Sequence, residues 1–218
     1  MQTRIFVLLI LGGTSSVGSA TVLGNPDKDV TTDRVAGLIK QLGNAKFAKR
    51  EAAGKDLVAI GEPALGALRQ AAAAADPEVQ ARAERIIAAI CKRVTTRELE
   101  KLHGTWSLVS YDFNGARLKG EDKAHQFVFK GDEWALQING ALFQGGTVQR
   151  IEVKKKLNAI DLLITQGAAV GVTAVSIYAI EGDSLNYLNC SEPRATEFAT
   201  KPGDGRHYLT FRRVTPKR

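Results

Sequence analysis

The residues best suited to metal binding or catalysis are few and lie far apart in the sequence. His103, His125 and His207 stand alone, and none has the ligand spacing of a metal site to Cys91 or Cys190. A metal centre needs three or four such side chains that converge on one point. We therefore expect no metal site.

The sequence motifs of the common enzyme classes are missing as well. The chain has no Gly-x-Ser-x-Gly nucleophile turn, no phosphate-binding loop, no His-Glu-x-x-His zinc motif and no dinucleotide fingerprint. Among the candidate acids, Glu181 and Asp183 fall in an expected turn. Asp161 falls in an expected strand, where an aspartate is usually outward and solvated. We expect no catalytic residue, no cofactor and no enzymatic activity.

The start of the chain has the residue order of a signal peptide. A positive charge at Arg4 precedes the apolar run 5–11, and small residues follow up to Ala20. The apolar run is far shorter than the roughly 20 residues of a membrane span. We expect residues 1–20 to be removed after about Ala20, and the protein to be secreted or to reside in the periplasm or cell envelope. The alternative is a buried N-terminal strand.

Export bears on the two cysteines, because an oxidising compartment permits a disulfide. Cys91 falls late in an expected helix, and Cys190 falls near the end of an expected strand. The pattern leaves open whether the two form a bridge or stay buried thiols.

The charge of the chain argues against nucleic acid as a partner. The sequence holds 30 Lys and Arg against 23 Asp and Glu, and the excess is divided evenly between the two halves. A nucleic-acid-binding protein usually concentrates its basic residues on one face or one element.

The elements that would position a site fall into two modules, of which the first is helical. A polar linker over 21–31 leads to a module over 32–95, where apolar residues recur at helical spacing from Val35 to Leu42. Further helices are expected over 45–60, from 63 onward, and from 77 after the capping residue Asp76. We expect the last helix to break near 94–96, and one helical turn to follow over 97–102.

The helical module contains a short internal repeat. Residues 44–50 align with 76–82, so that Phe47 matches Val79 and Arg50 matches Arg82. This pattern is similar to HEAT-like repeats, which commonly serve as protein-contact surfaces, and the resemblance implies a protein partner. The alternative is a plain four-helix cap that stabilises the second module.

The second module, over 98–214 with a tail at 215–218, is rich in β-structure. Alternating apolar residues predict strands at 106–113, 125–130, 133–138, 142–153, 159–165, 172–180, 184–190, 196–200 and 207–214. Asn-Gly pairs at 114–115 and 139–140 supply the positive φ angles of tight hairpins. About eight strands joined mainly by hairpins favour an antiparallel barrel, because closure removes exposed strand edges. The fold class is therefore α+β.

Three residues of this module carry a resemblance to a known fold family. Gly104 and Trp106 open the first strand after a helical turn, and arginines stand on the last strand. This arrangement is similar to the lipocalin signature. The resemblance implies that Arg212 or Arg213 lies over Trp106 and closes the base of the barrel. We take Gly104, Trp106 and Arg212 as this closing set.

Further segments extend the resemblance over 98–214. They lie in order at 127–132, 159–162, 177–185, 194–198 and 201–203. Together they resemble the lipocalin-like domain of unknown function that is abundant in planctomycete bacteria. That family has no established activity, so the resemblance implies a lipocalin-like barrel of about eight strands and no particular reaction.

Binding is the function class that remains. A barrel of about eight strands either holds one small apolar ligand or is filled by its own side chains. The aromatic residues that would line a pocket, or else form the core, are Trp106, Phe127, Phe129, Trp134, Tyr178, Tyr187 and Phe211.

We expect an exported, non-enzymatic interaction protein of the cell envelope whose helices contact a protein partner. The alternative is a carrier of a small apolar ligand in the barrel, and an enzyme of unknown class is less favoured. A carrier predicts a cavity, whereas an interaction protein predicts a filled barrel and an exposed apolar patch.

Overall fold

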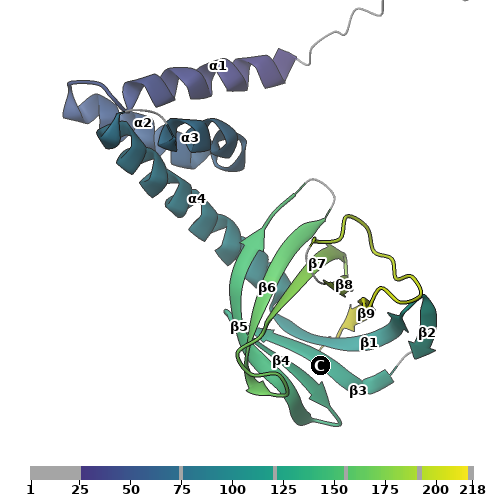
Figure 1. Ribbon diagram of the computed structural model, residues 1–218. Coiled ribbons are helices and arrows are strands. Elements are labelled where there is room, and N and C mark those ends of the chain that lie inside the picture. The colour runs from purple at the N-terminus through teal and green to yellow at the C-terminus, as the bar shows by residue number, and fades with distance from the viewer. Residues whose placement is uncertain (1–25, 74–75, 120–121, 155–156, 191–192, 216–218) are drawn as a thin grey trace, which may run out of the picture.

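The computed structural model describes residues 26–73, 76–119, 122–154, 157–190 and 193–215. A group of helices leads through one long helix into a β-barrel (Figure 1), so the α+β class and the order of the two modules are confirmed. The expected signal peptide at 1–20 lies outside the described residues, as does most of the expected tail.

The helical module packs its elements around an apolar core of its own, which includes Leu42, Leu57, Leu68 and Ile90. Its elements are α1 (Pro26–Gln41), α2 (Phe47–Ile60), the 3₁₀ turn η1 (Glu62–Ala64), α3 (Leu65–Ala72) and α4 (Pro77–Leu102). Helix α1 begins at Pro26, within the stretch that was expected to be a linker, and proline is well tolerated in the first turn of a helix.

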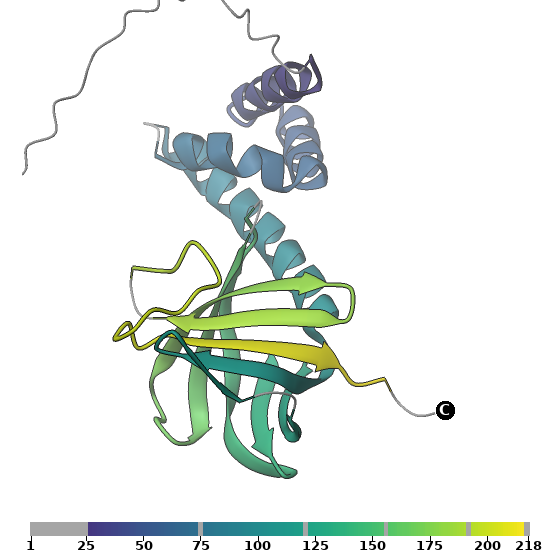
Figure 2. The same ribbon diagram turned by 90° about the vertical axis from the view of Figure 1, so that its right-hand side faces the viewer.

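Helix α4 is continuous, and the expected break near 94–96 is wrong. The helix starts where Asp76 caps the backbone N–H groups of Glu78 and Val79 at 2.9 and 3.3 Å. Its β-branched residues lower helix propensity only slightly, and Thr96 bonds back to the Lys92 carbonyl at 3.0 Å. The proposed module boundary at 95–98 therefore lies inside one helix, which Figures 1 and 2 show running into the barrel.

The barrel is a single antiparallel sheet that closes on itself. Its strands follow the order β2-β1-β3-β4-β5-β6-β7-β8-β9, and β1 also pairs with β9, so a ring of eight strands remains with β2 beside it. The bounds are β1 (Gly104–Phe113), β2 (Ala116–Lys119), β3 (Asp122–Lys130), β4 (Glu133–Ile138), β5 (Ala141–Glu152), β6 (Asn158–Gly167), β7 (Thr173–Glu181), β8 (Ser184–Cys190) and β9 (His207–Arg213). The expected antiparallel barrel of about eight strands is confirmed.

Hairpin turns bring these strands together as their composition predicts. Both residues of Asn114-Gly115 have positive φ, at 49° and 79°, and the same holds for Asn139-Gly140 at 52° and 77°. This is the geometry of the two-residue turn whose twist matches that of the flanking strands.

The strand expected at 196–200 is absent, and residues 193–206 form a loop against the outside of β7 and β8. Phe198 stacks on Tyr208 at 5.6 Å between ring centroids. Arg194 donates to the Ser176 carbonyl at 2.7 Å and to Asp161 at 2.6 Å. Side-chain contacts, and not the backbone hydrogen bonds of a strand ladder, thus hold this segment against the barrel.

Candidate functional site

The end of the barrel that α4 enters is closed by a few specific contacts. Gly104 has a φ of 114°, a backbone angle that favours glycine, where the chain turns from α4 into β1. Trp106 is fully buried, and its indole Nε1 donates to the Leu102 carbonyl at 2.7 Å. Leu99 and Leu102 of α4 pack into the barrel core. The last turns of α4 therefore form the floor of the barrel.

The arginine that covers Trp106 is Arg213, which corrects the choice of Arg212. Its guanidinium carbon lies 4.0 Å from the indole centroid, and its nitrogens donate to the His103 and Lys101 carbonyls at 2.6 and 2.7 Å. Arg212 is exposed. Alternation explains the difference, because Arg213 lies on the same face of β9 as the buried Phe211.

A buried carboxylate joins the floor to the barrel wall. Glu98 of α4 is 1% exposed, and its Oε2 accepts from the Tyr178 hydroxyl at 3.0 Å and from Asn158 at 3.2 Å. Its Oε1 accepts from Lys101 at 2.7 Å. Burial raises the pKa of Tyr178 well above its ordinary value, and the charge of Glu98 adds to that shift.

Sequence reasoning missed Glu98, although a signal was present. Ile90, Val94, Glu98 and Leu102 stand four residues apart, so they share one helical stripe. An acid on an otherwise apolar stripe has a buried partner or a functional role.

Above this floor lies a cluster of aromatic rings centred on Phe127. Its ring centroid is 4.4 Å from that of Phe129, 5.9 Å from Trp134, 5.3 Å from Tyr187 and 5.6 Å from Phe211. These residues come from β3, β4, β8 and β9, and the barrel brings them into one layer.

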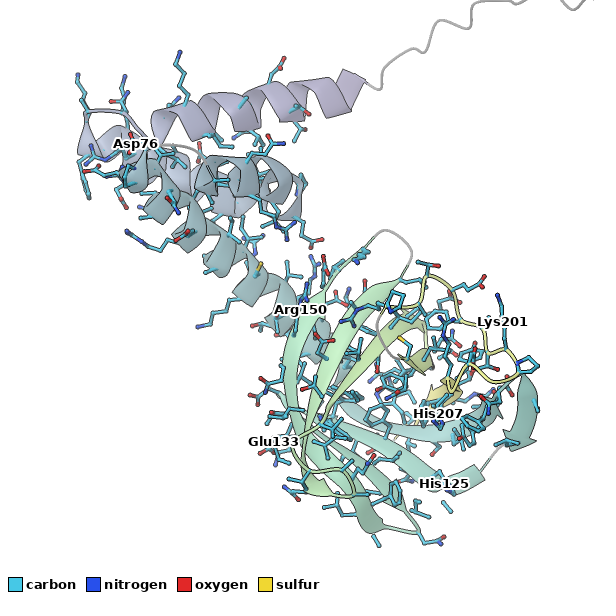
Figure 3. The ribbon with its side chains drawn as sticks, in the orientation of Figure 1. Asp76, His125, Glu133, Arg150, Lys201 and His207 are labelled. Atoms are coloured by element: carbon cyan, nitrogen blue, oxygen red, sulfur yellow. The ribbon has the colours of Figure 1, made fainter. Side chains whose placement is uncertain are left out.

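A cavity of about 830 Å³ occupies the other end of the barrel. It reaches the last residues of β1, β4, β6 and β8 and the first residues of β3, β5, β7 and β9, so it opens at the end away from α4. Figure 3 shows His125 and His207, which both line it, on this side of the barrel. Its volume lies in the range of small-molecule sites, roughly 300–1,000 Å³.

The structure divides the seven predicted pocket residues between cavity and core. Phe127, Trp134, Tyr187 and Phe211 line the cavity. Trp106, Phe129 and Tyr178 are buried in the packed half near the floor.

Apolar side chains make up most of the cavity wall. The apolar and aromatic lining residues are Leu108, Tyr111, Phe127, Trp134, Leu136, Ile138, Phe143, Leu162, Ile164, Val172, Ala174, Val175, Tyr187, Leu209 and Phe211. The remaining lining residues are His125, Gln144, Thr173, Asn189, Cys190, Asp204, Gly205 and His207. No lysine or arginine occurs among these described lining residues.

Three titratable residues near the opening, Tyr111, Asp204 and His207, make hydrogen bonds within the protein. The Tyr111 hydroxyl bonds to His207 Nδ1 at 2.7 Å, and the two rings stack at 5.9 Å. Burial lowers the pKa of His207 and raises the pKa of Tyr111, which favours the neutral form of each. Asp204 accepts from the backbone N–H groups of Lys201 and Arg206 at 2.7 and 3.0 Å.

Two polar groups lie deeper in the wall. The Tyr187 hydroxyl bonds to Ser176 Oγ at 2.6 Å, and burial raises the pKa of Tyr187 to about 12. The indole Nε1 of Trp134 differs, because it is the single buried side-chain polar atom of the described residues with no hydrogen-bond partner.

The opening is bordered by exposed apolar side chains. Leu142 and Phe143 of β5 are each 47% exposed, and Val170 and Val172, between β6 and β7, are 61% and 53% exposed. The two segments are neighbours, because Gln144 donates to the Ala168 carbonyl at 2.8 Å. Phe143 and Val172 also line the cavity, so this apolar rim is continuous with it.

The remaining candidate residues do not assemble a site. Cys91 is exposed, Cys190 is buried, and both are free thiols. Asp161 is an outward strand residue paired with Arg194, and Asp183 lies in an exposed turn. Within the described ranges, no group of His, Cys, Asp and Glu is arranged to hold a metal ion, and no helix is long and apolar enough to span a membrane.

The helical module carries a shallower hollow of about 400 Å³ between α2 and α4. Arg50, Lys55, Arg82 and Arg85 line it together with one acid, Glu51. Phe47, at the start of α2, is 66% exposed nearby in sequence.

Comparisons of the chain with protein-family models, with curated proteins and with solved structures found no match.

Proposed function

We propose that this protein binds a small apolar ligand inside its barrel. The observation that carries the proposal is the cavity of about 830 Å³, bounded by aromatic and aliphatic side chains and open at one end. Transfer of apolar surface from water into such a cavity is favourable at roughly 25 cal/mol per Å². The sequence analysis favoured a protein partner over a ligand, whereas the size and the apolar lining of the cavity lead us to propose the ligand first.

Two features support an exchangeable ligand over a barrel filled by its own residues. The packed half of the barrel already supplies a core, formed by Trp106, Phe129, Tyr178 and their neighbours next to α4. The apolar rim at Phe143 and Val172 gives a ligand a continuous apolar path from the surface into the cavity. Exposed apolar patches often mark ligand-binding grooves.

Nile red, an uncharged dye whose fluorescence rises in apolar surroundings, tests this proposal. We expect saturable binding of one dye per chain, and at least a tenfold weaker affinity in Ala174→Trp, which fills the cavity from β7. Gln149→Trp, which introduces the same side chain on the exposed face of β5, is the control and should bind as the wild type does. Equal binding by all three proteins would place the dye elsewhere and refute the proposal.

The helical module supports a second candidate function, contact with a protein partner. The hollow between α2 and α4 places four basic side chains against one acid, so an acidic segment of the partner complements it. We propose that both activities operate after export, in the secreted or envelope compartment, as the N-terminal pattern predicts.

Charge reversal tests this second candidate. The double variant Lys55→Glu, Arg85→Glu should lose proteins that the wild type captures from an envelope extract. The variant Lys92→Glu, which changes an exposed basic residue of α4 outside the hollow, should retain them. Equal capture by both variants would exclude the hollow as the contact.

A further inference from the structure

The charge of the cavity wall restricts the ligand that can enter it. Among the described lining residues, Asp204 is the one acid, and neither lysine nor arginine occurs. Two backbone N–H groups already donate hydrogen bonds to the Asp204 carboxylate. The other titratable residues of the wall are Tyr111, His125, Tyr187, Cys190 and His207. Neither lysine nor arginine is present there to pair with a buried anion. Burial of an unpaired carboxylate or ammonium group is strongly unfavourable.

One of the lining residues also has a buried hydrogen-bond donor that no described residue uses. Trp134 is 6% exposed, and its Nε1–H is unpaired among the described residues. The other tryptophan, Trp106, satisfies the same group with the Leu102 carbonyl at 2.7 Å. Native proteins pair nearly all of their buried polar atoms, so an exception requires an explanation.

The position of Trp134 supplies that explanation. The indole lies on the cavity wall, and Phe127 meets it edge to face at 5.9 Å. Neighbouring atoms cover Nε1 itself. Because the indole adjoins the cavity, a rotation of the Trp134 ring would bring Nε1 toward an oxygen of a bound ligand.

We propose that the cavity takes an uncharged, mainly hydrocarbon or aromatic ligand that carries one carbonyl or ether oxygen, and that this oxygen accepts a hydrogen bond from Trp134 Nε1. The inference rests on the proposed function, because it assumes that the ligand occupies the barrel. It adds the class of ligand and the residue that selects it.

Three compounds of nearly equal size test separately whether the ligand must be uncharged and whether it needs an acceptor oxygen. These are 4-acetylbiphenyl, which has an acceptor, 4-ethylbiphenyl, which has none, and biphenyl-4-carboxylate, which is an anion. We measure their affinities by equilibrium dialysis at pH 7.5. The ketone should bind at least fivefold more tightly than the hydrocarbon and at least tenfold more tightly than the carboxylate.

Two variants assign the preference to a residue. Trp134→Phe should reduce ketone affinity to that of the hydrocarbon and change hydrocarbon affinity by less than twofold. Tyr187→Phe removes another polar atom from the wall, one that is already paired with Ser176, and should leave the ketone-to-hydrocarbon ratio unchanged. Thermal unfolding of both variants verifies that they fold.

The outcomes distinguish this inference from the proposed function. If Nile red fails to bind, the proposed function and this inference both fail. If Nile red binds but the ketone and hydrocarbon bind equally, or neither binds, the role of Trp134 is refuted and ligand binding stands. If the carboxylate binds as well as the ketone, the ligand need not be uncharged. A ketone preference that survives in Trp134→Phe would also refute the assignment.

Discussion

Replacement of Glu98 by alanine should strongly destabilise the junction between α4 and the barrel. The variant removes a buried carboxylate that accepts hydrogen bonds from Tyr178 at 3.0 Å and Asn158 at 3.2 Å. A hydrogen bond to a charged group contributes about 1.5–3 kcal/mol, so two of them predict a loss of about 3–6 kcal/mol. The contact with Lys101, whose side chain is 52% exposed, adds little because solvent screens it.

Urea denaturation followed by tryptophan fluorescence measures this loss, because both tryptophans lie inside the barrel. Glu98→Gln keeps the shape and one acceptor oxygen but removes the charge, so we expect about 1–2 kcal/mol. Glu100→Ala changes an exposed acid on the same helix and should stay within about 0.5 kcal/mol of the wild type. If Glu98→Ala costs no more than Glu100→Ala, the carboxylate does not hold the junction.

Three further predictions concern the opening, the wall and the floor of the barrel. Burial holds the pKa of His207 below its ordinary value, so the free energy of unfolding should be highest above the pKa of an unfolded histidine and should decrease as the pH falls through the pKa of folded His207. The melting temperature should therefore fall less between pH 7.5 and pH 5 in His207→Gln than in the wild type. Gly146→Ala would place a methyl group 1.8 Å from a carbonyl oxygen of β6 and should cost about 3 kcal/mol in urea denaturation, whereas Gly37→Ala, in open space on α1, should be neutral or stabilising. Arg213→Leu should lower the melting temperature by more than Arg212→Leu, and equal effects would contradict the stacking role of Arg213.

Local signals predicted the elements of this fold well. Alternating residues placed β4 and β8 with the bounds that the structure has, and the Asn-Gly pairs located two hairpin turns. These signals are local because side-chain alternation and positive φ are properties of a few consecutive residues. The break expected in α4 was wrong because β-branched residues lower helix propensity only slightly. The strand expected at 196–200 was wrong because long-range side-chain contacts hold this segment as a loop.

The site was only partly predictable from the sequence. Every aromatic residue chosen for the pocket lies inside the barrel, because an inward position can be read from alternation. Whether an inward ring lines a cavity, as Phe127 does, or is packed into the core, as Phe129 is, depends on how completely side chains from other strands fill the space around it. Alternation contains no information about that volume.

The sequence by itself determined the class of the fold, the positions of most strands and the barrel that they form, since these follow from periodicity and turn chemistry. The tertiary structure alone decided which arginine covers Trp106, that Glu98 joins helix to barrel, and that Trp134, which lines the cavity, has a buried donor with no partner among the described residues. Each of these depends on partners tens of residues away, and their distances are set only when the sheet closes and α4 packs against its floor.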